Sequence, residues 1–460
     1  MVKRALLPLL FSLLLSACAG TDIKITKTGD NVVDPKALTL DGTRWGMAIN
    51  GNSFQQDALS SHMGIQYLAY YDAQRHVCLS RRKLPAGTWE TIRFTDYLFQ
   101  GNDAHNTISM GICPNDGTIH LAFDHHGHPL HYRVSRKDVA SSPETVNWDT
   151  SLFSPVTSEL EIGLPIKITY PRFFQTPDGE LQFCYRRGGS GGGDRMLVDY
   201  DSGEGKWVNT RQIDSGKGMF EDVMGESDSR CSYPNGYTYG PDDKLHATWV
   251  WRETPSDPNH DLIYVYSEDQ GKTWLDNEGR KIQGPPGINS PGIAVVDIPR
   301  TLGLMNTHGQ AVDSKGRIHA VMWHCTEESL RMAGSKPGEQ RWGPDSAHRY
   351  HHYWRNEEGS WQHRELPWIS GSRPKLFIDH KDNTFLVYEK QGKLEIAAAS
   401  SRARYVDWTV VHSENGPFVN EMLGDPYRWS QEGILSLMVQ DSPENPSEPT
   451  PLRILDFHIE

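Results

Sequence analysis

The sequence predicts an all-β fold, a seven-bladed β-propeller. Three observations lead to this prediction: a strand template that recurs seven times, a tryptophan that follows most copies, and the scarcity of helical periodicity. A unit that repeats along the chain is typical of arrays in which neighbouring units cover each other's apolar faces. A β-sandwich array is the alternative, and the near-regular spacing of the copies favours the propeller.

Each copy of the template begins at a turn and continues as an apolar strand. The copies are GIQYLAYYD (64–72), GTIHLAFDH (117–125), GELQFCYRR (179–187), DKLHATWVW (243–251), GRIHAVMWH (316–324), NTFLVYEKQ (383–391) and GILSLMVQD (433–441). The following tryptophans are Trp89, Trp148, Trp207, Trp274, Trp361 and Trp408. Each unit has room for the four strands of a blade. In the fourth, SEDQGKTW (267–274) fits the Asp-box turn of sialidase-like blades. The C-terminal LRILDFHIE is expected to pair with residues 43–50 and close the ring.

The N-terminus predicts export. Lys3 and Arg4 precede an apolar run that is too short to span a bilayer, as in a secretory signal. The segment Leu15-Ser16-Ala17-Cys18 resembles a lipobox, which implies lipidation of Cys18; an ordinary signal peptide is the alternative. We therefore expect a signal peptide over 1–18, a linker over 19–38 and one catalytic propeller over 39–460. Ala19 favours an outer-membrane or cell-surface lipoprotein, with a secreted form as the alternative, and a monomer is expected.

Charge and cysteine content limit the function. The net charge of −13 argues against a molecule that attracts polyanions as a whole, so an anionic substrate must meet local positive charge. Nucleic acid is excluded as a partner on the same ground. Beyond Cys18 the cysteines number five, an odd count without a CxxC motif, so no disulfide scaffold is expected. We expect these thiols to be buried as small apolar groups.

Alignment of the repeats sorts the histidines. His120 aligns with His246 and His319, which is the behaviour of a structural repeat position. The strand-end position varies between copies and holds His125 and Arg187 in the second and third. Variation at one end of each blade predicts a binding face. The segments before the strands add to the same end, so we expect a cleft lined by His105, His125, Tyr170, Tyr233 and either Arg186 or Arg187.

Histidine, tyrosine and arginine together suit β-elimination from a uronic acid. An arginine can neutralise the carboxylate beside the weakly acidic C5 proton. A histidine or tyrosine can then remove this proton, and the other can protonate the leaving oxygen. These roles require no metal or redox cofactor. Clusters of the same residue types also bind sugars without reacting.

The chain resembles the ulvan lyases of the seven-bladed propeller type, polysaccharide lyase family 25, related to family 24. The features that carry the resemblance are HN (105–106), DHH (124–126), TYPRF (169–173) and CYRRGG (184–189). The resemblance implies His105 and Tyr170 as the acid/base pair and Arg186 as the group that neutralises the uronate. It implies that His125 and Tyr233 position the substrate, and Asn106 and Arg187 are expected to bind it beside them. The choice of Arg186 rests on the resemblance, because repeat alignment alone favours Arg187.

The substrate implied by the resemblance is ulvan, a sulfated polymer of rhamnose and uronic acid, which is too large to import intact. Two alternatives stay open. A sialidase-like propeller glycosidase would need an arginine triad and a tyrosine–glutamate pair, which we cannot place. A non-catalytic glycan-binding lipoprotein would need the aromatic and basic lining without an acid/base pair.

A second group of histidines, with one cysteine, predicts a structural metal. Imidazole and thiolate suit Zn²⁺, and the resemblance to the ulvan lyases also implies a structural metal. The expected ligands are His308, Cys325, His348 and His352. His324 is adjacent to Cys325 and faces the other way in a regular strand, so both cannot bind the same ion.

Overall fold

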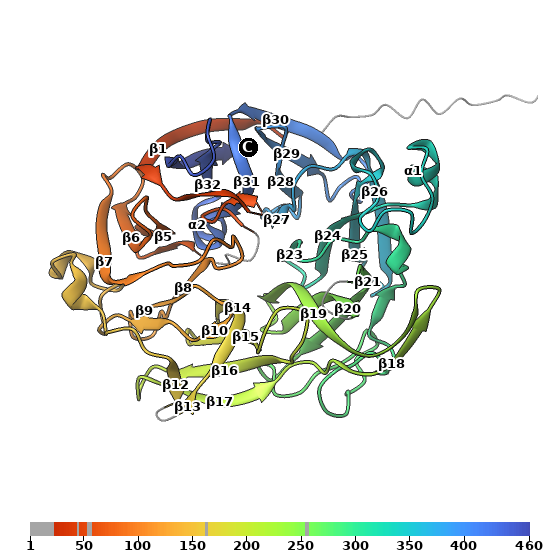
Figure 1. The fold of residues 1–460 in the computed structure, drawn as a ribbon, viewed down its shortest axis with the longest axis horizontal. Helices are drawn as coiled ribbons and strands as arrows, with labels where there is room; N and C mark the ends of the chain where they lie inside the picture. Colours follow the sequence, from red (N-terminus) through yellow and green to blue (C-terminus); the bar gives the residue numbers. More distant parts are fainter. Residues whose placement is uncertain (1–22, 44–45, 53–57, 162–163, 254–256) are drawn as a thin grey trace, which may run out of the picture.

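The computed structural model describes residues 23–43, 46–52, 58–161, 164–253 and 257–460. Seven sheets of three to five strands surround a central axis within this part of the chain (Figure 1). The predicted propeller is therefore confirmed. The signal peptide and Cys18 lie outside the described residues. Among those described, no helix has the length and apolar character needed to cross a membrane.

The first four blades follow one another in sequence order, counter-clockwise around the ring in Figure 1. Blade 1 contains β4 (Leu59–His62), β5 (Ile65–Tyr71), β6 (His76–Lys83) and β7 (Glu90–Leu98). Blade 2 contains β8 (Ile108–Ile112), β9 (Ile119–Phe123) and β11 (Tyr132–Val134). Blade 3 contains β10 (His126–Pro129), β14 (Lys167–Gln175), β15 (Leu181–Arg187), β16 (Arg195–Asp201) and β17 (Lys206–Gln212). Blade 4 contains β18 (Lys217–Asp222), β19 (Gly225–Tyr239), β20 (Leu245–Glu253), β21 (Asn259–Ser267) and β22 (Ala294–Val296).

The remaining blades complete the ring. Blade 5 contains β23 (Gly309–Val312), β24 (Ile318–His324), β25 (Arg349–Arg355) and β26 (Trp361–Ile369). Blade 6 contains β27 (Lys375–Ile378), β28 (Thr384–Lys390), β29 (Lys393–Ala399) and β30 (Thr409–Asn415). Blade 7 contains β31 (Phe418–Gly424), β32 (Ile434–Asp441), β33 (Thr450–Ile459) and β1 (Ile25–Ala37). Two short pairs, β2 (Thr39–Thr43) with β3 (Gly46–Ala48) and β12 (Glu159–Glu161) with β13 (Leu164–Pro165), and two short helices, α1 (Glu327–Met332) and α2 (Pro426–Glu432), lie between them.

The seven copies of the sequence template form β5, β9, β15, β20, β24, β28 and β32, one strand in each blade. Every residue of β5, β9 and β24 is buried. These strands are covered on both faces by neighbouring blades, so the whole run is apolar or hydrogen-bonded rather than alternating. The five described cysteines are free and buried, as expected.

The ring closes in a way that the sequence did not predict. The outermost strand of blade 7 is β1, which pairs antiparallel with β33 from Ile25 opposite Ile459 to Ala37 opposite Thr450. Residues 25–37 are therefore a strand rather than part of the expected linker over 19–38. The segment expected to close the ring instead forms the β2–β3 pair. The sequence pattern did not predict this strand, because its outer face is exposed and polar and it lacks the apolar template.

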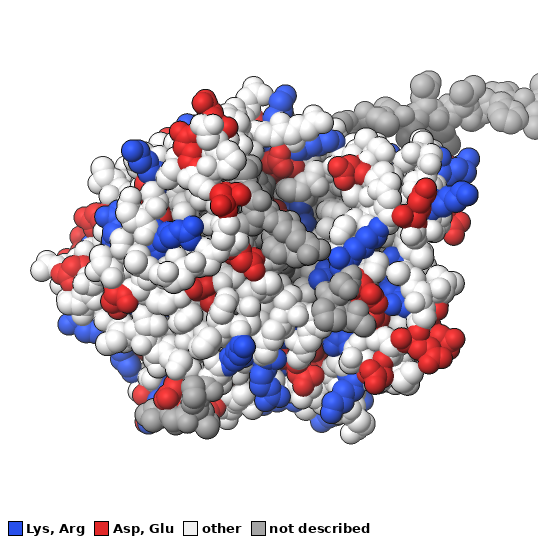
Figure 2. Space-filling model, viewed as in Figure 1, with Lys and Arg blue, Asp and Glu red and all other residues white. Residues whose placement is uncertain are grey.

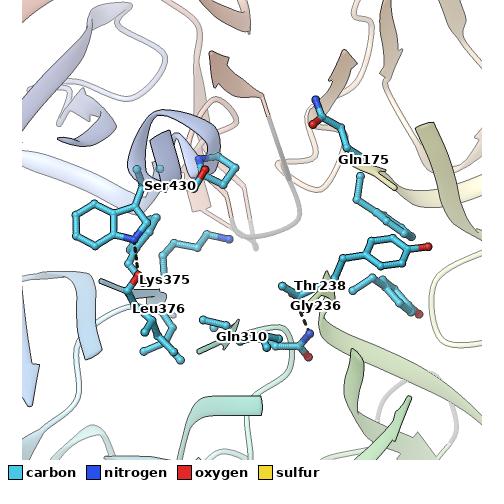
Figure 3. A pocket seen from close by; sticks show the side chains of 18 of the residues that line it. Gln175, Gly236, Thr238, Gln310, Lys375, Leu376 and Ser430 are labelled. Atoms are coloured by element: carbon cyan, nitrogen blue, oxygen red, sulfur yellow. Dashed lines mark hydrogen bonds between the residues drawn. The ribbon is translucent and has the colours of Figure 1, made fainter. Parts of the chain in front are cut away.

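A pocket of about 660 Å³ lies between the inner strands β14, β19, β23 and β27 and helix α2. Figure 3 shows Gln175, Thr238, Gln310 and Lys375 pointing into it from different blades. His308 also lines this pocket, whereas His105, Tyr170 and Arg186 do not. The site predicted for chemistry is thus separate from the central pocket.

Candidate functional site

Tyr170 owes its position to an irregularity in β14. The register between β14 and β15 shifts between Thr169 and Arg172, and Tyr170 has φ of +54°. A non-glycine residue in this region is strained, and such strain concentrates at functional sites. A bulge next to a strand end re-aims the side chain. Tyr170 thereby packs its ring on Tyr233 of β19, with 6.0 Å between the centroids.

The hydroxyl group of Tyr170 meets two polar neighbours. Its oxygen lies 3.3 Å from Nε2 of His126 and 3.2 Å from Oγ of Ser190. Ser190 belongs to the glycine-rich segment 188–194, which the sequence places directly after β15. Burial raises the pKa of Tyr170, the neighbouring Tyr233 raises it further, and the positive charge of Arg186 opposes both.

Arg186, near the end of β15, is fully buried. Its Nη2 donates to the carbonyl oxygen of Ser232, while Nε and Nη1 have no acceptor among the described residues. Its guanidinium carbon lies 5.3 Å from the ring centre of Tyr170 and 4.4 Å from that of Tyr233. Burying a cation with two unpaired N–H donors costs free energy unless an anion accepts hydrogen bonds from them. The structure therefore holds a ready-made anion contact beside Tyr170.

Asp103 joins two histidines. Its Oδ1 lies 2.5 Å from Nδ1 of His105, and its Oδ2 lies 2.6 Å from Nδ1 of His126. The two imidazole rings stack with 4.3 Å between centroids. An ionised carboxylate can only accept, so each Nδ1 carries the proton and each Nε2 carries the lone pair that can accept one. Nε2 of His126 then faces the hydroxyl of Tyr170.

The electrostatics of this group follow from its burial. Burial lowers the pKa of His105, and the hydrogen bond to Asp103 opposes that shift. Burial disfavours the ionised form of Asp103, yet the hydrogen bonds from both imidazoles hold its pKa well below the usual range. Asp103 is therefore a permanent carboxylate at neutral pH, and His105 is neutral.

Tyr233 and Arg252 extend the site into blade 4. Arg252 Nη1 donates to the hydroxyl of Tyr233 at 3.0 Å, and its guanidinium carbon lies 4.4 Å from the centre of the same ring. Tyr233 therefore lies against both Arg186 and Arg252. The predicted Asn106 is buried, and its Nδ2 donates to Asp124. Oδ1 of Asn106 has no donor among the described residues.

Two predicted residues lie elsewhere. The ring of His125 is buried, and its Nε2 accepts the backbone N–H of His131 at 2.8 Å. Burial and the neighbouring His131 lower the pKa of His125 well below its usual value. The side chain of Arg187 is exposed and, by strand alternation, lies on the face opposite Arg186. The structure thus brings together His105, Tyr170, Arg186 and Tyr233, but not His125 or Arg187.

The residues that sequence reasoning missed are Asp103, His126 and Ser190. Strand alternation carried from Phe123 to His125 pointed to the wrong histidine, because Asp124 has φ of +63° and interrupts the strand. A new strand, β10, begins at His126, which pairs with Thr169 beside Tyr170. An acid two residues before His105 was the available signal for Asp103.

The four predicted zinc ligands do not converge. His308 Nε2 accepts the backbone N–H of Trp323, and His352 lies 3.0 Å from His319. His348 Nε2 donates to the carbonyl oxygen of Trp342 at 2.5 Å, and Cys325 Sγ lies 3.9 Å from the same oxygen. Within the described residues, the three side chains of metal-binding type that lie close together are Asp103, His105 and His126. Their short N–O separations are those of hydrogen bonds.

Part of the local positive charge expected for an anionic substrate is buried. Arg186 and Arg195 are both fully buried, so neither adds to an exposed patch. On the face shown in Figure 2, lysine and arginine are interspersed with aspartate and glutamate. Arg186 therefore offers positive charge to an anionic ligand from inside the site.

Comparison with known proteins identifies a family and several relatives that are similar to this chain. Residues 65–368 match the BNR repeat-containing family. The chain belongs to this family. It is 27% identical over 323 residues to an ulvan lyase, long isoform, of Alteromonas sp., covering 58% of this chain and 31% of that protein. It is also 27% identical over 318 residues to the long-isoform ulvan lyase of Pseudoalteromonas sp. (strain PLSV), with the same coverage. The chain thus spans about a third of the length of these relatives.

Two solved structures share the fold. The crystal structure of the polysaccharide lyase Uly1 superposes with a TM-score of 0.73 at 19% identity, covering 94% of this chain and 99% of that one. An ulvan lyase of polysaccharide lyase family 25, bound to -[GlcA(1-4)Rha3S]-, superposes with a TM-score of 0.65 at 13% identity, covering 93% and 95%. At these identities the likeness establishes the propeller.

Proposed function

We propose that this protein is a polysaccharide lyase that cleaves ulvan by β-elimination at its uronic acid. The observation that carries the proposal is Arg186, a fully buried guanidinium with two unused donors beside the hydroxyl-bearing ring of Tyr170. A uronate carboxylate has the charge and the two oxygens to occupy these donors. The relatives named as ulvan lyases support the choice of polymer.

Binding of the carboxylate to Arg186 prepares the first step. Neutralising the carboxylate makes the C5 proton more acidic, because the charge that develops on the sugar can spread onto the carboxyl oxygens. The same contact places C5 next to Tyr170. Tyr233 and Arg252 lie beside this position and line the path of the neighbouring sugar.

Tyr170 is the base in this proposal. Its own proton moves to Nε2 of His126, which Asp103 holds in the accepting tautomer, and Arg186 stabilises the phenolate. The phenolate takes the C5 proton, the C5–H electron pair forms the C4–C5 double bond, and the C4–O4 bond breaks. The proton that Tyr170 has gained then passes to O4. Atoms and charge balance without an added reactant.

His105 has the second place in the proton network, stacked on His126 and bonded to the same carboxylate. As the acid/base partner expected from the sequence, it is the alternative base, with Nε2 accepting the C5 proton and then returning it to O4. The proposed proton transfers need no metal ion. We also propose export as a surface lipoprotein anchored at Cys18, since a polymer must be cut before uptake.

The test is ultraviolet absorbance during incubation with purified ulvan. Elimination creates a double bond conjugated to the carboxylate, so absorbance rises together with new chain ends. Hydrolysis would give new reducing ends without absorbance and would refute the lyase assignment. Binding without either would support a glycan-binding protein. Arg186→Gln is expected to lower kcat/KM by about 100-fold or more, since it removes the carboxylate contact.

A further inference from the structure

A second pocket, of about 370 Å³, lies between blades 4 and 5. We call it the inter-blade pocket; its lining includes Lys244, His246, Tyr264, Tyr266, Arg317 and Arg355. It is formed by the turn between β19 and β20 and by the turns β23–β24 and β25–β26. Tyr233 and Arg252 lie at the other ends of β19 and β20, so this pocket opens at the end of the blades opposite the proposed active site.

Three aromatic rings form its wall. The rings of His246, Tyr264 and Tyr266 are nearly parallel, with interplanar angles of 18°, 27° and 22° and centroids about 6 Å apart. Tyr264 is buried, while Tyr266 remains partly exposed at the pocket. Such flat apolar surfaces with polar edges are the usual platform for ring-shaped polar ligands.

His246 provides the first polar contact that protein groups leave open. Its Nδ1 is bonded to the hydroxyl of Tyr264 at 2.8 Å, and its Nε2 has no partner among the described residues although the side chain is 3% exposed. Buried polar atoms without partners are rare and call for a ligand or a water. The pocket it lines provides room for one.

The repeat gives an internal control for this observation. The equivalent His120 uses both nitrogens, with Thr118 at 2.7 Å and Tyr132 at 2.6 Å. The equivalent His319 has His352 at 3.0 Å from Nδ1, and its Nε2 has no hydrogen bond but faces the carboxylate of Asp313 at 3.6 Å. In blade 4 the residue two positions before the histidine is Lys244, which pairs with Asp242 at 3.1 Å and lies 5.6 Å from the ring centre of Tyr266. Nε2 is therefore hydrogen-bonded in blade 2 and faces a carboxylate in blade 5, whereas in blade 4 it has neither contact among the described residues.

Arg355 provides the second open contact. The other lining cations are paired with carboxylates: Lys244 with Asp242, Lys315 with Glu357, and Arg317 with Asp313. Arg355 instead donates to the carbonyl oxygens of Gly359 and Asn277, and no carboxylate of the described chain forms an ion pair with it. Asp242 and Glu357 also line the pocket but are paired with Lys244 and Lys315, so among the described lining residues Arg355 is the cation without an ion-pair partner.

We propose that the inter-blade pocket is a second binding site for an acidic saccharide. Arg355 binds its carboxylate or sulfate, His246 Nε2 meets a hydroxyl group, and Tyr266 packs against the sugar ring. The proposal rests on the proposed function for the identity of the polymer. A long substrate chain held on the far side of the propeller would keep the protein on the polymer between cleavage events.

The experiment is isothermal titration of a tetrasaccharide cut from ulvan, with Tyr170→Phe as the background so that the ligand is not consumed. Two sites are expected in this background. Adding Arg355→Gln or Tyr266→Ala should remove one site or weaken it at least tenfold, and adding Arg186→Gln should remove the other. Arg402→Gln, which removes an exposed arginine from a different blade, is the matched control and should keep both. Two pocket variants are used so that the test does not depend on a single variant, which could fail to fold.

A single site in the background protein, or two unchanged sites in both pocket variants, overturns the proposal. Equal binding of neutral maltotetraose at the pocket would overturn the acidic class of ligand. If the wild-type protein produces no absorbance on ulvan, the proposed function fails by itself. The pocket is then still tested with a heparin tetrasaccharide, which carries the same acidic groups, and loss of that binding in Arg355→Gln would support the site.

Discussion

Replacement of Tyr170 by phenylalanine removes one oxygen and keeps the rest of the site. The ring would still lie on Tyr233 and beneath the guanidinium of Arg186, because both contacts involve the ring rather than the hydroxyl. The hydroxyl lies 3.3 Å from Nε2 of His126 and 3.2 Å from Oγ of Ser190. These distances are long for hydroxyl hydrogen bonds, which are usually about 2.7–2.8 Å.

The effect on stability should accordingly be small. A net hydrogen bond contributes about 1 kcal/mol, and long ones contribute less. The loss is partly offset, because the variant no longer has to remove this hydroxyl group from water when it folds. We expect the free energy of unfolding to change by less than about 1 kcal/mol.

The effect on activity should be large. The variant lacks the hydroxyl proposed as the base, and loss of general base catalysis costs about 10²–10⁴ in rate. A thousandfold loss corresponds to about 4 kcal/mol of transition-state stabilisation. The initial rate of absorbance increase on ulvan, with denaturant unfolding of the same samples, measures both quantities.

The matched control is Tyr239→Phe, which removes a hydroxyl bonded to Gln182 at 2.8 Å at the far end of β19. Its activity should stay within about twofold of wild type. If Tyr170→Phe keeps more than a tenth of the wild-type kcat/KM while the protein stays folded, Tyr170 is not the base and the reasoning from Arg186 outward is wrong.

Three further predictions follow from the same structure. Asp103→Asn should lower kcat/KM by about 10–100-fold without unfolding the protein, because the amide no longer holds both imidazoles in one tautomer; unchanged steady-state kinetics would contradict this. Gly193→Ala should lower the melting temperature, since Gly193 has φ of +96° and a Cβ there would lie 2.1 Å from a backbone oxygen, whereas Gly192→Ala meets open space and should be neutral. Burial lowers the pKa of His120 to about 3 and that of His246 to about 4, so the unfolded chain takes up their protons first. Their contribution is complete above about pH 6.5 and is lost as pH falls toward 4, by about 3 kcal/mol or more each; urea unfolding that is equally cooperative and stable at pH 7.5 and 5 would refute it.

The repeat pattern made the fold predictable because each blade contains one strand buried on both faces. It also separated His120, His246 and His319 as structural positions, and all three are buried. The outer strand β1 could not be found in this way, because its outward side chains are polar. The information for that strand lies in its pairing with β33, more than 400 residues away in the sequence.

Prediction of the site succeeded where alternation holds and failed where it breaks. Arg186 and Arg187 point to opposite faces of β15, and the repeat alignment alone chose the exposed one. Asp124 and Tyr170 both have positive φ, and each shifts the side chains that follow by one place. No periodic pattern carries through such a residue, so His126 rather than His125 reaches Tyr170. The prediction of the zinc ligands was wrong for a related reason. Nearness in sequence does not make His308, His348 and His352 face one another.

The pairing of β1 with β33 has a consequence for biosynthesis. A ribosome makes β1 before the strands of blades 1 to 6 and makes β33 after them, so β1 stays unpaired until the intervening chain has been made. Blades 1 to 6 can form from contacts between neighbours in the chain, whereas the final seam requires two distant segments to meet, and contacts of such long range form slowly. A protein stalled just before the seam would have an open arc with two bare blade edges, which are the surfaces through which sheets aggregate.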